Sequence, residues 1–276
     1  MLVDIISDLH IDFWINPSSG TRQKHIDKYI NEVLKPLGGE VLIVAGDIGH
    51  KNFQMKEIMT ALGEIYPHVI IVLGNHDLYI EANDPKKTRK DSVDRLLGII
   101  KIVDGIDNLT MLRGQTVVIN GIKFGGSMGW YNFSEFGNEN LGDAEIQKMY
   151  LSRSSDPHYI RGMTSTNMYG DNRLNGREIF RTEIEKITEV LGQQPQVMIT
   201  HIPPWISDEN KKLTEFQEDL NYEYFDRPEL LKQVPIWVHG HTHYPEDKVH
   251  NGCRVVSQPL GYKTDELRTS IKQIEI

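Results

Sequence analysis

The first hundred residues alternate between short apolar runs and longer amphipathic stretches. Apolar runs at 2–7, 41–45 and 69–73 are typical of buried strands. Between them, 24–35 and 53–66 carry apolar residues at helical spacing. Because the strands are continuously apolar and alternate with helices, the pattern favours a parallel sheet covered on both faces.

The pattern changes after residue 109, where short strands follow one another. Asn120-Gly121 and Asn251-Gly252 each predict a hairpin turn, so antiparallel pairs are expected beside the parallel ones. Further helices are expected at 91–102, at 143–151, behind a capping Asn175 and at 228–233, and further strands at 109–112, 116–119, 122–126, 196–200, 236–238 and 270–276.

No linker, repeat or low-complexity tract divides the sequence, so we expect one domain over 1–276. The stretch at about 130–175 is polar and weakly patterned. It could be a lid or substrate loop, or a surface excursion, and the sequence leaves both readings open.

Polar side chains follow five of the predicted strands at the point where each strand ends. In an open α/β sheet the carboxyl ends of the strands are where sites assemble, so distant residues can converge there. The side chains are Asp8 and His10, Asp47, Asn75 and His76, His201, and finally His241 with His243.

With Asn75 counted as the ligand after the third strand, two aspartates, one asparagine and four histidines are too many ligands for one tetrahedral zinc, but they suit two divalent metals that share a carboxylate. Nitrogen and oxygen ligands without thiolate favour Mn, Fe, Zn, Co or Ni. From the residues alone, Asn75 and His76 are equal candidates for the ligand after the third strand.

Composition indicates which kinds of binding partner and which cellular compartment are expected. The net charge of −9 argues against a general nucleic-acid or anionic-membrane surface, although bound metals would still attract a phosphate. The single cysteine, Cys253, excludes an internal disulfide and is expected to be a small packing residue. No long apolar span or signal peptide is evident, so a cytoplasmic protein without membrane partners is expected.

Five blocks, in this order, resemble the calcineurin-like metallophosphoesterase superfamily: Asp8-Leu9-His10, Gly46-Asp47, Gly74-Asn75-His76-Asp77, His201 and Gly240-His241-Thr242-His243. The sequence around the last two blocks is most similar to the bacterial and phage phosphohydrolase branch. The resemblance implies an α/β sandwich of two mixed β-sheets flanked by helices, with a dinuclear metal site at the strand C-terminal ends.

The resemblance also implies a role for each residue. Asp8, His10 and His243 would hold one metal ion; Asn75, His201 and His241 would hold the other; Asp47 would bridge them. A metal-bridging hydroxide would attack a phosphomonoester or phosphodiester in line. His76 would donate a proton to the leaving oxygen, and Asp77 would orient His76.

Three alternatives remain beside a small-molecule phosphoesterase. A Ser/Thr protein phosphatase would carry Asp-Arg-Gly after Gly-Asp and Glu after Gly-Asn-His, whereas this chain has Asp77. A nuclease of the same superfamily would need a basic groove. A non-catalytic binding module would be expected to have lost ligands.

Three residues outside the blocks also have alternative interpretations. His50 is expected on a surface loop rather than beside the site. Trp130-Tyr131 could form an aromatic platform for a base or aryl group, or pack in the core.

Overall fold

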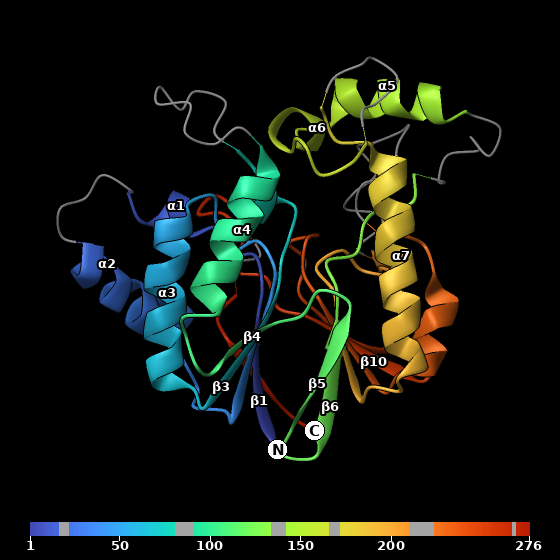
Figure 1. Cartoon of the computed structure of the whole chain (residues 1–276). Helices are drawn as coiled ribbons and strands as arrows, with labels where there is room; N and C mark the ends of the chain where they lie inside the picture. The colour runs from blue at the N-terminus through green and yellow to red at the C-terminus, as the bar shows by residue number, and fades with distance from the viewer. Residues whose placement is uncertain (17–21, 81–90, 134–141, 166–171, 210–223, 267–268) are drawn as a thin grey trace.

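Two β-sheets lie face to face, and helices cover their outer sides (Figure 1). The computed structural model describes residues 1–16, 22–80, 91–133, 142–165, 172–209, 224–266 and 269–276. Helices α2, α3 and α4 lie outside one sheet and α7 outside the other, while α5 and α6 lie above the sheets (Figure 1). No helix in the described ranges is long and apolar enough to cross a membrane.

The first sheet has the strand order β11-β1-β2-β3-β4. Strands β1 to β4 are parallel, and β11 pairs antiparallel with β1 at the edge. The bounds are β1 Leu2–Ile6, β2 Val41–Ala45, β3 His68–Val72, β4 Leu109–Met111 and β11 Lys272–Glu275.

The second sheet has the order β5-β6-β7-β8-β10-β9. Its central strands β6, β7, β8 and β10 are parallel, and the two hairpins β5–β6 and β9–β10 add antiparallel edges. The bounds are β5 Gln115–Ile119, β6 Ile122–Gly126, β7 Val197–Ile199, β8 Ile236–His239, β9 Glu246–His250 and β10 Cys253–Ser257.

Most helices match the amphipathic stretches of the sequence, and the rest are short. The expected helix at 24–35 begins as an α-helix and ends as a π-helix. The bounds are α1 Ile11–Trp14, α2 Arg22–Lys28, the π-helix η1 Tyr29–Leu34, α3 Asn52–Ile65, the 3₁₀-helix η2 His76–Leu78, α4 Ser92–Val103, α5 Asp143–Arg153, α6 Asp156–Tyr159, α7 Gly176–Gly192 and the 3₁₀-helix η3 Pro228–Gln233.

The strands are apolar throughout because both of their faces are buried. In β2, Val41, Ile43 and Ala45 pack in the layer between the two sheets. The alternate residues Leu42 and Val44 pack against the outer helices. This double burial explains why the parallel strands show no polar alternation in the sequence.

The predicted fold class, an α/β sandwich of two mixed sheets, is confirmed. Both Asn-Gly turns join antiparallel strands, and Asn120 and Asn251 have the left-handed φ that such turns need. Cys253 is buried in the core, as expected. The lid role of the stretch at about 130–175 stays a prediction; its described parts include α5, α6 and the buried pair Trp130 and Tyr131.

Candidate metal centre

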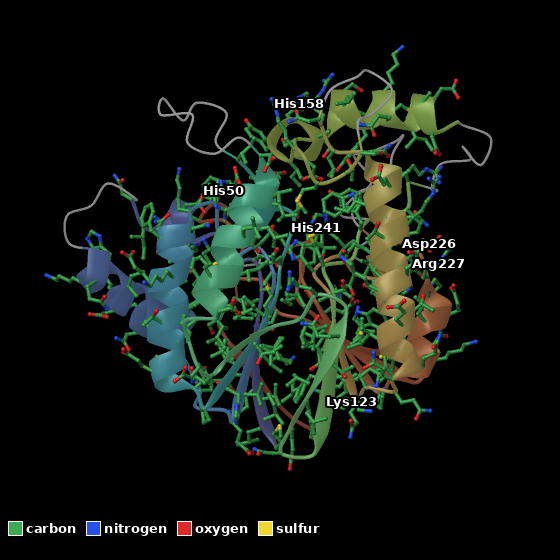
Figure 2. The ribbon with its side chains drawn as sticks, viewed as in Figure 1. His50, Lys123, His158, Asp226, Arg227 and His241 are labelled. Atoms are coloured by element: carbon green, nitrogen blue, oxygen red, sulfur yellow. The ribbon has the colours of Figure 1, made fainter. Side chains whose placement is uncertain are left out.

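The candidate ligands converge at the carboxyl ends of strands from both sheets. His241 lies between the helical layers, below α5 and α6 (Figure 2). Three groups of side chains have ligand atoms that all lie within 4.8 Å of one another: Asp8 with His10 and His243, His10 with Asp47 and His76, and Asp8 with Asp47 and His201.

Asp47 lies between the two halves of the cluster. Its Oδ2 atom is 3.6 Å from Nε2 of His10 and 3.4 Å from Nε2 of His201. Nε2 of His10 is in turn 3.1 Å from Nε2 of His243, and the latter atom is 3.4 Å from Oδ1 of Asp8. One carboxylate therefore faces both sets of imidazoles, as a bridging ligand would.

Asn75 and His241 lie on the His201 side. Oδ1 of Asn75 is 3.2 Å from Nε2 of His201, and the ring centroid of His241 is 5.2 Å from that of His201. The backbone N–H of His241 donates to Asp8 at 3.1 Å. The structure thus brings all seven predicted ligands together.

Strained backbone accompanies the cluster. Five of the seven residues have φ between 39° and 73°: Asp8, His10, Asp47, His241 and His243. Left-handed conformation is uncommon outside glycine, and its clustering indicates a functional site.

Glycines in the motifs allow the close approach of neighbouring loops. A Cβ atom on Gly74 would lie 2.0 Å from Oδ1 of Asp47, and one on Gly46 would lie 2.4 Å from Nδ1 of His201. Gly46 also has a φ of 87°. Any side chain at either position would therefore displace a candidate ligand.

Burial and charge together make the cluster attractive to cations. Burial alone would raise the pKa of Asp8 and Asp47, but the imidazole of His243 beside Asp8 and that of His201 beside Asp47 lower both. Burial lowers the pKa of His201 and of His243. Asp47 beside His201 and Asp8 beside His243 outweigh this effect and raise the pKa of each imidazole to about 9. A metal ion would displace those protons, since imidazole binds metal in its neutral form.

Two of the candidate ligand imidazoles are oriented by an acceptor at Nδ1. In His201 this nitrogen lies 2.9 Å from the carbonyl oxygen of Ala45, which can only accept, so Nδ1 carries the hydrogen. In His243 it lies 2.7 Å from Oδ2 of Asp265. Both contacts leave Nε2 to face the cluster, as second partners of metal-binding histidines commonly do.

Asn75 is oriented by a carboxylate from α6. Its Nδ2 atom donates to Oδ1 of Asp156 at 2.8 Å, so its Oδ1 atom faces His201. Asp156 is buried and also accepts from the hydroxyl groups of Tyr79, Tyr131 and Tyr150. Burial raises the pKa of this carboxyl to about 6.

His76 contacts His50, contrary to the expectation that His50 lies on a surface loop. Nε2 of His50 is 2.8 Å from Nδ1 of His76, and Nδ1 of His50 is 3.2 Å from Oδ2 of Asp12. The prediction that Asp77 orients His76 is therefore corrected, because His50 lies at that nitrogen instead. The position directly behind Gly46-Asp47 was the sequence signal for His50.

Asp77 instead holds backbone. Its carboxylate accepts from the N–H groups of Gly74, Ile48 and Gly49 at 2.9 to 3.0 Å, so it joins the turn after β3 to the loop after β2. Burial and, next, the nearby Asp47 carboxylate raise the pKa of Asp77 to about 7. The buried Arg95 of α4 joins the same two segments by donating to the carbonyl oxygens of Gly49, His50 and Asp77.

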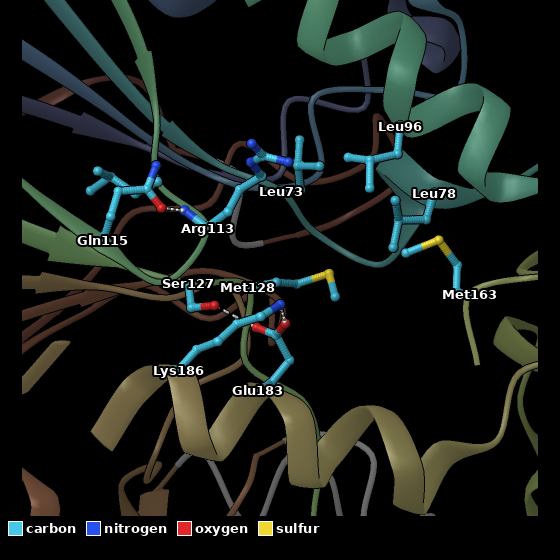
Figure 3. Close-up of a pocket in the computed structure, with 11 residues that line it drawn as sticks. Leu73, Leu78, Leu96, Arg113, Gln115, Ser127, Met128, Met163, Glu183 and Lys186 are labelled. Atoms are coloured by element: carbon cyan, nitrogen blue, oxygen red, sulfur yellow. Dashed lines mark hydrogen bonds and ion pairs between the residues drawn. The ribbon is translucent and has the colours of Figure 1, made fainter. Parts of the chain in front are cut away.

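A cavity of about 380 Å³ lies beside the centre, between α4 and α7 (Figure 3). Leucines 73 and 78, on either side of the Gly-Asn-His-Asp turn, form part of its apolar wall. The buried Glu183 on the opposite wall already accepts from Ser127 and Lys186. Within the described chain, its lining contains none of the nine predicted site residues, so we place the chemistry at the strand ends and not in this cavity.

A family model for calcineurin-like phosphoesterases matches residues 1–245, and the chain belongs to that family. This confirms the resemblance seen in the sequence blocks, and with it a family of the phosphoester-hydrolase type that uses divalent metals.

Two further similarities cover most of the chain. The uncharacterized protein L509 of Acanthamoeba polyphaga mimivirus is 27% identical over 237 residues, which are 80% of this chain and 78% of that protein. The crystal structure of a phosphopantetheinyl hydrolase from Mycobacterium tuberculosis has a TM-score of 0.70 at 17% identity, covering 99% of this chain and 95% of that one. At that identity the likeness concerns the fold.

Proposed function

We propose that this chain is a dinuclear-metal phosphoesterase that hydrolyses a small phosphomonoester or phosphodiester. The convergence of two buried carboxylates and four imidazoles around Asp47 supports the proposal most directly. Family membership supports phosphoester hydrolysis but leaves the substrate open.

The donor set fits two divalent ions. Asp8, His10 and His243 would hold one ion, and Asn75, His201 and His241 the other, with Asp47 shared. When bound, the ions would supply positive charge for the phosphoryl oxygens and acidify the attacking water. Mn, Fe, Zn, Ni and Co all accept this set of nitrogen and oxygen ligands.

His76 is proposed to protonate the leaving oxygen. In its protonated form Nδ1 donates to His50, and Nε2 is left for the substrate. Burial lowers the pKa of His76 to about 3 in the absence of substrate. A negatively charged phosphoryl group nearby would favour the protonated form.

A nuclease is the weaker candidate, because the chain carries a net charge of −9 and a polyanion requires basic contacts. Small esters avoid that requirement, since only one phosphate has to reach the metal centre.

The test combines metal analysis with a substrate panel. Metal-loaded protein should bind two ions per chain and release phosphate or alcohol from at least one ester among monoesters, diesters, cyclic nucleotides and phosphoproteins. His76→Ala should retain both ions while kcat falls by ~10²–10⁴-fold, the range for loss of a general acid. Asp47→Ala should lose both ions.

Two outcomes would contradict the proposal. Protein that binds no metal, or that binds metal but hydrolyses no ester, would favour a non-catalytic binding module. Loss of metal in His76→Ala would make His76 a ligand instead of an acid.

A further inference from the structure

Aromatic side chains surround one side of the metal centre. The ring centroid of Tyr262 lies 4.4 Å from that of His10, and the two ring planes are nearly parallel, 24° apart. The same centroid lies 4.9 Å from that of His243. Phe13 lies 5.1 Å from Tyr262 and 5.8 Å from His50, edge to face with both. Phe13 and Tyr262 therefore border both the candidate ligands and the proposed acid.

A second line of rings leads away from His76. The ring centroid of Tyr79 lies 4.3 Å from that of His76, and that of Tyr159 lies 5.2 Å from that of Tyr79. The interplanar angle is 23° in both pairs. The proposed acid thus has an aromatic neighbour in this second line of rings as well.

The outermost ring in each line is open to solvent. Phe13 is 49% exposed and Tyr159 is 36% exposed, although both are large and at least partly apolar. A solvent-exposed phenylalanine beside the candidate metal ligands needs an explanation, because covering its ring would be favourable. For Trp130 and Tyr131 the sequence left an aromatic platform and core packing both open; each is 1% exposed and packs in the core.

We infer that Phe13 and Tyr262 form an aromatic shelf that binds the planar aromatic ring of the leaving group, either the base of a leaving nucleoside or an aryl ring, with Tyr159 as a further contact. The inference rests on the proposed function, since the phosphoryl group has to lie at the metal centre for its leaving group to reach the shelf. Every base and aryl ring has a face that can stack on such side chains. The acidic chain favours a mononucleotide or small aryl ester over a polynucleotide.

The test compares matched esters in wild type and variants. The pairs are phenyl against ethyl and nucleoside against ribose, in whichever ester class the substrate panel shows to be hydrolysed, and the readout is the ratio of kcat/KM within each pair. In Phe13→Ala the aromatic-to-aliphatic ratio should fall about 5- to 100-fold, the range for loss of one stacking partner. Phe13→Leu keeps the apolar bulk and should lower the ratio as well.

Leu37→Ala is the matched control, because Leu37 is 54% exposed and lies outside the ring contacts described above. It should leave the ratio at its wild-type value. The pair of esters whose kcat/KM ratio falls in Phe13→Ala identifies the ring that the shelf binds. A fall for nucleoside against ribose indicates a nucleobase, and a fall for phenyl against ethyl indicates an aryl group.

Binding of phenylphosphonate and ethylphosphonate to metal-loaded protein, measured by calorimetry, tests the shelf without turnover. Tighter binding of the phenyl compound that Phe13→Ala abolishes would support the shelf even if no ester in the panel is hydrolysed. Equal ratios in wild type and Phe13→Ala, together with equal affinity for the two phosphonates, would overturn the shelf while leaving the hydrolase proposal standing.

Discussion

Three carboxylates outside the sequence motifs hold side chains of the centre. Asp265 contacts Nδ1 of His243, and Asp12 contacts Nδ1 of His50. Asp156 accepts from the amide of Asn75. Each contact decides which atom of its partner faces the cluster, and such outer contacts contribute strongly to metal affinity and activity.

His50→Ala removes the contact at Nδ1 of His76. We expect metal content to be unchanged and kcat to fall ~10–100-fold, the usual cost of losing an outer-shell partner. His50→Gln keeps an acceptor for the Nδ1 hydrogen and should recover part of the loss. Steady-state kinetics with metal analysis of the same samples would check this.

The control for that prediction is His158→Ala, because His158 is an exposed histidine on α6 (Figure 2). Among the hydrogen bonds described, its imidazole contacts only the carbonyl oxygen of Leu151. Equal losses in the two variants, or loss of metal in His50→Ala, would show that His50 does not act through His76.

The convergence of the candidate ligands could be predicted from the sequence, but their hydrogen-bond partners could not. Each of the seven candidate ligands follows a predicted strand, so their common location follows from sheet geometry. Asp156 and Asp265 lie in loops or short helices with no periodic pattern, and only tertiary packing brings them to Asn75 and His243. The role of Asp77 was predicted wrongly because adjacency in sequence to His76 does not fix where a carboxylate points.

Two helices, α6 and α4, carry side chains that contact the candidate centre or the loops that hold it. The four-residue helix α6 carries Asp156, and α4 carries Arg95, which joins the loops after β2 and β3. Neither helix could be given this role from the sequence, although α4 was expected at nearly its observed bounds. The strands were predictable because their burial on both faces leaves a continuous apolar signal, whereas a four-residue helix such as α1 or α6 leaves almost none.

Asp156→Ala tests whether α6 orients a ligand. Without the carboxylate, the amide of Asn75 is free to turn, and the three tyrosine hydroxyl groups lose their acceptor. We expect the affinity for one of the two metal ions to fall ~10–100-fold, while the other ion stays bound. Titration with metal followed by calorimetry would resolve the two sites.

Asp143→Ala is the matched control, since Asp143 is an exposed carboxylate on the neighbouring α5 and pairs with Arg181 at the surface. Its two metal affinities should be those of wild type. Equal weakening of both sites in Asp156→Ala would indicate a general loss of structure.

On the scale of the whole molecule, the two sheets meet at a cluster of buried carboxylates and imidazoles. Asp8 and Asp47 are at most 1% exposed, and the candidate partners that face them are mainly imidazoles. Buried charge of this kind is costly unless it is paired or bound to metal. Because the ligands come from both sheets, an ion bound there also joins the two halves of the sandwich.

Metal binding should therefore stabilise the fold. A ligand at 100 times its Kd adds ~2.7 kcal/mol to the free energy of unfolding, and for a chain of this size that raises Tm by about 5–10 °C. Thermal unfolding of chelator-treated protein, with and without MnCl₂, measures the shift. Asp47→Ala should show almost no metal-dependent shift, because Asp47 faces both halves of the cluster. An equal shift in wild type and Asp47→Ala would mean that the stabilising ion binds elsewhere on the surface, and the bridging assignment of Asp47 would fail.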